Sequence, residues 1–138
     1  MIQRIQTLFL LAAVICGVIL FFIPVASAIN ASGLDLFVTG IKGSAKWYLH
    51  LIFYPCLILP FVQIFMFKNR VKQIKIGKLA IAYWVIWAVI FVILSLSIDN
   101  LKPSFGAIIP LLSILFIYLA NKAIRKDEDL VRSIDRIR

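Results

Sequence analysis

The sequence predicts an all-α integral membrane protein, a bundle of four transmembrane helices with a cytoplasmic C-terminal helical extension. Three observations support this class. The chain has 138 residues, of which 63% are hydrophobic, whereas a soluble domain is about 45–50% apolar. Its mean hydropathy is +1.04. Four long apolar runs (about 8–28, 47–67, 79–98 and 104–120) are separated by polar segments, and the cations gather in only a few of these. We therefore expect a single membrane domain over residues 1–138.

The first apolar run, residues 8–28, contains no charged residue. At about 1.5 Å per residue it is long enough to cross a hydrocarbon core of about 30 Å. The layout of Arg4, the run, and Ala26-Ser27-Ala28 at its end also fits a cleavable signal peptide. The run is longer than the usual apolar region of a signal peptide, which favours a retained first helix. Glycines interrupt the following connection, 29–46, in which residues 34–39 could form a short strand or an interfacial segment.

The second run, 47–67, begins with Trp47 and Tyr48, which are suited to anchor its outer end at the membrane interface. Pro55 and Pro60 lie inside the run. Each proline removes one backbone hydrogen bond, so we expect a bend or a local break in this helix.

The third run, 79–98, has Tyr83, Trp84 and Trp87 near its start, where they are predicted to be interface anchors at the cytoplasmic end. An outer turn over 99–103 leads into the fourth run, 104–120, which has Pro110 in its interior. No Gly or Pro separates this run from the charged tail, 121–138. We expect the fourth helix to continue past the bilayer.

A basic segment between the second and third runs sets the orientation. It is predicted to be a loop that contacts anionic headgroups through Lys68, Arg70, Lys72, Lys75 and Lys78. Of the 15 Lys and Arg residues, all except Lys42, Lys46 and Lys102 belong to this loop or to the two ends of the chain. Basic segments stay on the cytoplasmic side of a membrane, so both termini are predicted to be cytoplasmic. The net charge of +9 therefore indicates topology and lipid contact, and we expect no nucleic-acid partner.

The tail has the pattern of an amphipathic helix. Its apolar side chains fall within an arc of about 120° formed by Leu130, Val131, Ile134 and Ile137, whereas Arg125 and Arg132 lie on the opposite side. Glu128 and Arg132 are spaced as an i,i+4 ion pair. One interpretation is a solvated helix whose apolar stripe rests on the headgroups. A second is a docking face for a second copy or another protein, with these six residues as candidate contacts, and a third is a disordered tail.

The sequence contains no pattern that indicates catalysis, a cofactor or a metal. No charged residue lies in the middle of an apolar run, which argues against a proton-coupled pump. His50 is the single histidine and is expected to be an interfacial polar residue. Gln63 is expected to form a hydrogen bond between helices and not to contact a substrate. Cys16 and Cys56 form no C-x-x-C pair and are expected to be small apolar residues. We predict that the protein is not an enzyme.

The two ends of the chain resemble a known family. The opening segment MIQRIQTLFLL, the segment LANKAIRKDEDLVRS over 119–133 and the ending DRIR over 135–138 are similar to small bacterial inner-membrane proteins of domain-of-unknown-function family 4293. The resemblance implies four transmembrane helices with both termini inside, in the bacterial inner membrane. It implies no activity.

Two functions follow as expectations. The first is a non-enzymatic accessory or interaction subunit that docks onto a larger membrane complex or assembles with itself. The second is a small oligomeric lipid- or solute-handling transporter, which would have a cleft lined by Gln63, Ser95 or Ser97. Expected partners are membrane lipids, including anionic headgroups, and another membrane protein or a second copy of the chain.

Overall fold

A computed structural model describes residues 3–29, 35–37, 47–67, 69–97 and 102–135. Within these ranges the chain forms four α-helices, one 3-10 turn and three short strands. In chain order they are α1 (Gln3–Ile19), β1 (Ala26–Ile29), β2 (Asp35–Phe37), α2 (Trp47–Phe65), α3 (Arg70–Ser97), β3 (Lys102–Pro103), η1 (Phe105–Ile108) and α4 (Ile109–Asp135).

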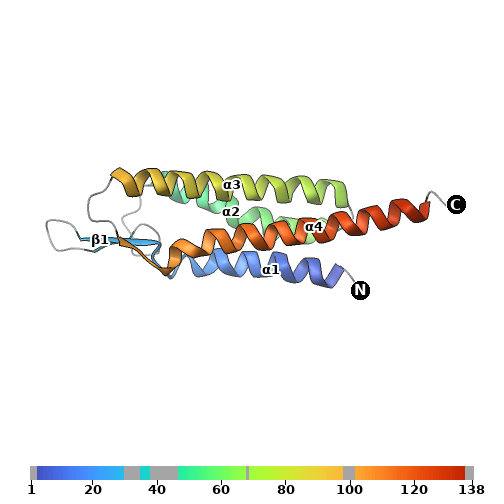
Figure 1. The fold of residues 1–138 in the computed structure, drawn as a ribbon, viewed down its shortest axis with the longest axis horizontal. Helices are drawn as coiled ribbons and strands as arrows, with labels where there is room; N and C mark the ends of the chain where they lie inside the picture. The colour runs from blue at the N-terminus through green and yellow to red at the C-terminus, as the bar shows by residue number, and fades with distance from the viewer. Residues whose placement is uncertain (1–2, 30–34, 38–46, 68, 98–101, 136–138) are drawn as a thin grey trace.

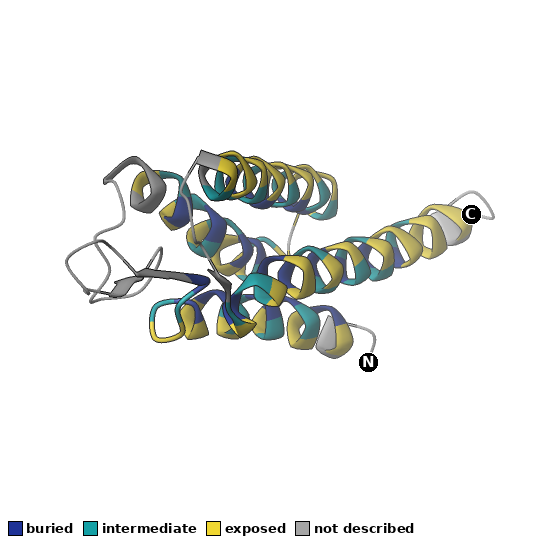
Figure 2. Cartoon of the chain, turned by 60° about the vertical axis from the view of Figure 1, so that its left-hand side comes forward, coloured by how far each residue is buried: buried dark blue, intermediate teal, exposed yellow. Residues whose placement is uncertain are grey.

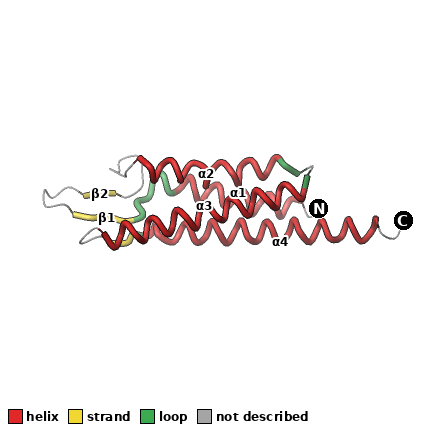
Figure 3. The backbone as a smooth tube through the Cα atoms, turned by 90° about the horizontal axis from the view of Figure 1, so that it is seen from above, coloured by secondary structure: helices red, strands yellow, loops and turns green. Residues whose placement is uncertain are grey.

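The four helices lie side by side, and helices that follow one another in the chain run in opposite directions (Figure 1). Each helix packs against the next, and α4 also packs against α1, which closes a four-membered ring. The predicted all-α class is therefore confirmed. The beginnings of α1 and α3 and the end of α4 lie at one end of the bundle, and the strands lie at the other. Helix α4 extends beyond its neighbours, as Figure 3 shows from a second direction.

Helix α1 does not fill the predicted run 8–28. It ends at Ile19, a turn follows, and Ala26–Ile29 belong to a strand. The turn is held by hydrogen bonds from the backbone nitrogens of Phe22 and Ile23 to the carbonyl oxygen of Ile19, each 3.0 Å. Pro24 explains the stop, because proline has no N–H to continue a helix and disfavours helical geometry in the preceding residue.

The prolines of α2 and α4 interrupt neither helix. Helix α2 is continuous through Pro55 and Pro60, without the local break that was one of the two expectations. Pro110 is not in the interior of α4 but is its second residue, because η1 takes up residues 105–108. A proline is tolerated in the first turn of a helix, where its missing N–H would have had no helical partner.

The predicted basic loop is mostly helical. Helix α3 begins at Arg70, so four of the five predicted loop cations lie in its first turns, and Lys68 lies outside the described residues. Asn69 acts as the N-cap, since its Oδ1 accepts a hydrogen bond from the backbone nitrogen of Lys72 at 3.2 Å. Its carbonyl oxygen accepts one from the backbone nitrogen of Gln73 at 2.9 Å. Because Asn69 caps the helix, α3 begins at Arg70 and includes the cations that were predicted to form a loop.

A three-stranded antiparallel sheet with the order β2-β1-β3 covers the end opposite the termini. Ser27 pairs with Phe37 on one side and with Lys102 on the other. Strand β2 lies inside the short strand considered for 34–39, and the other two strands were not predicted. Gly106 of η1 fits tightly against this region, since a Cβ there would lie 2.5 Å from the carbonyl oxygen of Pro24.

The core contains a cluster of aromatic rings. Phe53 of α2 meets Trp84 edge-on at 6.0 Å between ring centroids, and Trp87 stacks on Phe91 at 5.8 Å. Trp84 and Trp87 are buried, so the prediction that they are interface anchors was wrong. The reason is the face of α3 on which they lie: Trp84 and Trp87 continue the buried stripe of Gln73, Gly77 and Ala80 at spacings of three or four residues.

Large apolar side chains cover the outside of the bundle. Within the described part of the chain, Arg70–Ile93 and Phe105–Ser133 are long and apolar enough to cross a membrane. Only 22% and 28% of their most apolar windows are buried. Exposed residues form the outward faces of the helices, and buried residues face the middle (Figure 2). This pattern differs from the core helix of a soluble protein, which is mostly buried, and is consistent with a membrane environment.

Candidate functional site

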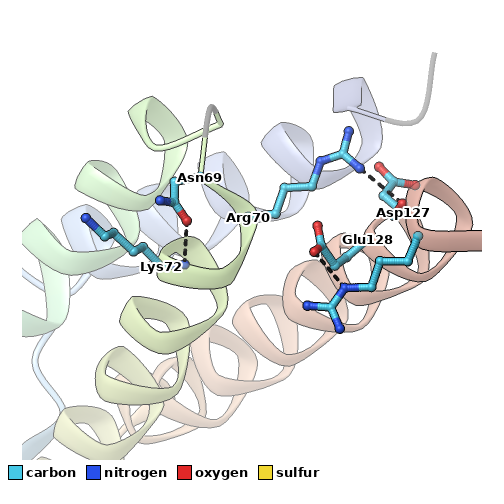
Figure 4. A network of polar contacts seen from close by, with 6 residues as sticks. Asn69, Arg70, Lys72, Asp127 and Glu128 are labelled. Atoms are coloured by element: carbon cyan, nitrogen blue, oxygen red, sulfur yellow. Dashed lines mark hydrogen bonds and ion pairs between the residues drawn. The ribbon is translucent and has the colours of Figure 1, made fainter. Parts of the chain in front are cut away.

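Of the candidate contacts in the tail, all except Ile137 lie on α4, which continues to Asp135 as predicted. Leu130 and Val131 are exposed to 46% and 42%. The side chains of Ile134 and Ile137 lie outside the described residues. The expected ion pair is present, with Arg132 Nε 3.1 Å from Glu128 Oε1 (Figure 4).

A buried polar cluster lies where α4 leaves the bundle, and it takes one or more side chains from every helix. Gln63 of α2 donates from Nε2 to Asn121 Oδ1 of α4 at 2.8 Å. Gln73 of α3 donates from Nε2 to the carbonyl oxygen of Gln63 at 3.0 Å. Gln63 is fully buried and Gln73 is 4% exposed. These contacts confirm the predicted role of Gln63 as a hydrogen-bonding residue between helices.

The second half of the cluster is centred on Asp127, one turn and a half further along α4. Its Oδ2 accepts a hydrogen bond from Gln6 Nε2 of α1, and both side chains are 7% exposed. Arg70 reaches across from α3 and donates from Nη1 to the carbonyl oxygen of Asp127 at 3.0 Å (Figure 4). Asp127 thus joins the first turns of α1 and α3 to α4. Because a carboxylate acceptor strengthens a hydrogen bond, this pair contributes more than a neutral one.

A glycine makes room for the cluster. A Cβ at Gly77 would lie 2.1 Å from Asn121 Oδ1 and 2.6 Å from Gln63 Nε2. Both distances are below 3.0 Å, so one or both amide side chains would have to move. The absence of a side chain at Gly77 therefore lets the two amides meet between α3 and α4. The cluster requires a small residue there as well as the polar groups themselves.

The polar cluster places the cations of α3 and α4 at the same distance along the bundle axis. Asn121 lies beside Gly77, and Asp127 lies beside Gln6 and Arg70. These two levels are about 9 Å apart along α4, and the intervening residues of α4 include Lys122, Arg125 and Lys126. On α3 the same interval, from Arg70 to Gly77, carries exposed Lys72 and Lys75, and exposed Lys78 follows directly after it. A belt of positive charge therefore lies across α3 and α4 at this end of the bundle.

A shallow, open groove lies along the outer face of α4 at this belt and is lined by α4 alone. It is lined by Leu119, Lys122, Ala123, Arg125, Lys126, Asp129, Leu130 and Ser133. Three cations and one carboxylate face it, next to two leucines. Arg125 and Leu130, two of the predicted tail contacts, thus share this groove, whereas Val131 and Arg132 do not line it.

Deeper in the bundle, buried polar atoms lack hydrogen-bond partners. They are Trp84 Nε1, Trp87 Nε1 and Ser113 Oγ, and Gln63 Oε1 and Asp127 Oδ1 are further examples in the polar cluster. Ser95 Oγ donates to the carbonyl oxygen of Val92 at 2.7 Å, within its own helix. Cys16 is half-buried, Cys56 is buried, and both are free thiols. No group of three or more His, Cys, Asp or Glu side chains that could hold a metal ion occurs among the described residues.

Four members of the polar cluster were not identified from the sequence: Gln6, Gln73, Asn121 and Asp127. The available signal was the spacing of Ala120, Ile124 and Asp127, which places an acidic residue on the buried face of α4. The tail was interpreted through its apolar arc alone, which left Asp127 among the solvated charges.

The family model described as "Domain of unknown function (DUF4293)" matches residues 2–137. This is the family that the two ends of the chain resemble, and the match extends over both the bundle and the tail. No curated protein and no solved structure matches the chain.

Proposed function

The chain belongs to the family described as domain of unknown function DUF4293, and we propose that it is a non-enzymatic interaction subunit of the bacterial inner membrane. In this proposal all four helices cross the bilayer. Both termini and the end of α4 lie in the cytoplasm, where the tail docks onto another membrane protein or a second copy of the chain.

The exposed apolar surface supports four spans. Helices α1 and α2 are shorter than α3 and α4, with 17 and 19 residues, which gives each a length of about 26–29 Å. That is close to the hydrocarbon thickness of about 30 Å. Large apolar side chains are exposed along both helices, for example Leu8 at 66% and Leu51 at 63%. Because α1 and α2 run alongside α3 and α4 in one ring, a bilayer that surrounds the longer pair also surrounds the shorter pair.

The charge belt supports the orientation. Its lysines and arginines lie at the end that carries the beginnings of α1 and α3, whereas the sheet lies at the other end. The positive-inside rule places the belt in the cytoplasm. The test is labelling of single cysteines, in a background with Cys16 and Cys56 replaced by Ala, using a reagent that does not cross membranes. We expect Arg70→Cys to react only in inside-out vesicles and Lys102→Cys only in right-side-out vesicles. The reverse pattern contradicts the proposed orientation.

The single observation that carries the docking function is the extension of α4 past the polar cluster. Beyond Asp127 the helix leaves its neighbours, yet it still presents Leu130 and Val131, which are exposed to 46% and 42%. An apolar pair on a projecting helix is stabilised when a partner covers it. The transporter alternative has less support, because Gln63 is buried and bonded to Asn121 instead of lining a cleft.

The docking proposal is tested with the tail variant Leu130→Ser/Val131→Ser. We expect it to lose the complex that forms after mild detergent extraction, measured as a fall in assembly mass by light scattering. The matched control is Asp129→Ser, which changes the exposed residue directly before Leu130. This variant should keep the assembly mass of the wild type. A self-assembly loses one or more copies of the chain, and a heteromeric complex loses a second polypeptide. An unchanged mass in the double variant contradicts the proposal.

A further inference from the structure

The outer face of α4 changes character along its length without changing direction. Toward the sheet it presents Leu111 and Leu115, which are exposed to 63% and 49%, and Ile108 of η1, exposed to 54%, precedes them on the same side. The same face then continues through Leu119 to Lys122 and Lys126, at successive spacings of three or four residues. One continuous stripe thus passes from apolar to cationic.

The change occurs at the depth where a bilayer changes from acyl chains to phosphates. From the start of η1 to Lys122 the chain rises about 27 Å, close to the hydrocarbon thickness of about 30 Å. Lys122 and Lys126 are then about 6 Å apart along the helix axis. The headgroup layer on each side of a bilayer is about 5–8 Å thick. The cations therefore occupy this layer when α4 spans the membrane.

We propose that the groove over Leu119–Ser133 is a binding site for one anionic phospholipid of the cytoplasmic leaflet. Lys122, Arg125 and Lys126 bind its phosphate and headgroup, and Leu119 contacts the upper part of an acyl chain. The occupant follows from the chemistry of the lining: three cations against the single carboxylate of Asp129, directly above an apolar strip. An acidic protein segment complements the cations but leaves the apolar strip below them uncovered. The inference rests on the membrane placement proposed above.

The polar cluster keeps this site in place. Asn121 and Asp127 lie on the opposite face of α4 and are tied to the other three helices. The backbone that carries the three cations is therefore fixed at both ends of the interval. A fixed set of cations selects one lipid more strongly than a flexible basic tail, because less conformational entropy is lost on binding.

The test uses the full-length protein, purified in mild detergent and stripped of lipid, with phosphatidylglycerol as the anionic probe and phosphatidylcholine as the zwitterionic one. Binding is followed by native mass spectrometry as lipid is added. Each Lys or Arg near an anionic surface contributes about a fivefold factor in binding. We expect Lys122→Gln/Arg125→Gln/Lys126→Gln to weaken the first phosphatidylglycerol by up to about a hundredfold. Wild-type protein should bind phosphatidylcholine much more weakly than phosphatidylglycerol.

The matched control is Lys72→Gln/Lys75→Gln/Lys78→Gln, which removes the same charge from α3 within the same belt. It should retain the first phosphatidylglycerol. Equal loss in both triple variants overturns the proposal in favour of diffuse attraction to the belt, as does retention in the α4 variant or equal binding of the two lipids. Displacement of the lipid by excess inorganic phosphate also overturns it, because the site then recognises phosphate without the acyl chain. The melting temperature of each variant verifies that it is folded.

A cysteine at Lys122 separates failure of this site from failure of the membrane placement. If Lys122→Cys is labelled from the cytoplasmic side but the α4 triple variant binds lipid as wild type does, only the lipid site is wrong. If Lys122→Cys is labelled from the opposite side, the proposed orientation is wrong, and the proposed lipid site is then wrong as well.

Discussion

Replacing Gly77 by Ala tests the packing on which the polar cluster depends. The added Cβ would lie 2.1 Å from Asn121 Oδ1, 2.5 Å from Asn121 Nδ2 and 2.6 Å from Gln63 Nε2. These atoms are the far ends of two side chains, but they already bond each other at 2.8 Å. Neither amide can move away from the methyl group without disturbing that bond.

The expected magnitude combines opposing effects. Overpacking of a filled site costs about 1–3 kcal/mol, and loss of the hydrogen bond between helices costs about 0.6 kcal/mol on average in a membrane. Alanine has a higher helix propensity than glycine, which offsets this loss of stability by up to about 1 kcal/mol. We therefore expect Gly77→Ala to lower the free energy of unfolding by about 1–3 kcal/mol.

The assay is a titration of protein in mild detergent with a denaturing detergent, followed through tryptophan fluorescence, since Trp84 and Trp87 are buried in the folded state. The same substitution is then measured in an Asn121→Ala background, where the clash with Asn121 is removed and the Gln63 amide can rotate away. There Gly77→Ala should be neutral or stabilising, which gives a coupling of about 2 kcal/mol. Gly17→Ala is the control glycine, because its Cβ would approach Leu57 only to 3.0 Å. An equal loss from Gly77→Ala in both backgrounds refutes the reasoning.

Three further predictions use the same preparation. Asp127→Leu should destabilise the fold by about 1–3 kcal/mol because it leaves Gln6 Nε2 without its acceptor, whereas Asp129→Leu on the exposed face should change stability by less than about 0.5 kcal/mol; equal effects contradict the role of Asp127. Ser113→Ala should be neutral or stabilising by up to about 1 kcal/mol, since its buried Oγ has no partner, and a clear loss of stability in the titration contradicts this. A membrane-permeant maleimide should modify half-buried Cys16 faster than buried Cys56, and equal rates contradict the burial of Cys56.

The sequence predicted the features that depend on composition and spacing along a single helix. The number of helices, the continuation of α4 into the tail, the Glu128–Arg132 pair and the inter-helix role of Gln63 are confirmed. Each follows from local information: an apolar run, the lack of a helix-stopping residue, an i,i+4 spacing, or a polar group in an apolar run. The number of spans, the orientation, the tail contacts and the absence of enzymatic activity stay predictions.

Errors in the sequence analysis arose where a helix boundary depended on capping or on one proline. Hydropathy places a helix boundary where the charged residues begin, so the cations after Asn69 were predicted to form a loop. They belong instead to the first turns of α3, which Asn69 caps. Trp84 and Trp87 were assigned to an interface by their nearness to the cations, but they lie on the buried face of α3 with Gly77 and Ala80. In the same way, Pro24 ended α1 inside a run that is apolar to Ala28.

The amino-acid sequence by itself determined that the chain forms apolar helices with a strongly asymmetric distribution of positive charge, because both properties are sums over neighbouring residues. Only the tertiary structure decided that Gln6, Gln63, Gln73, Asn121 and Asp127 form one buried cluster, which fixes the level of the cations on α3 and α4. These residues come from four helices, and two of them that form a hydrogen bond, Gln6 and Asp127, are 121 positions apart in the sequence. Which of them meet depends on the order and depth of helix packing, and in this chain Gly77 leaves the space in which the amides of Gln63 and Asn121 meet.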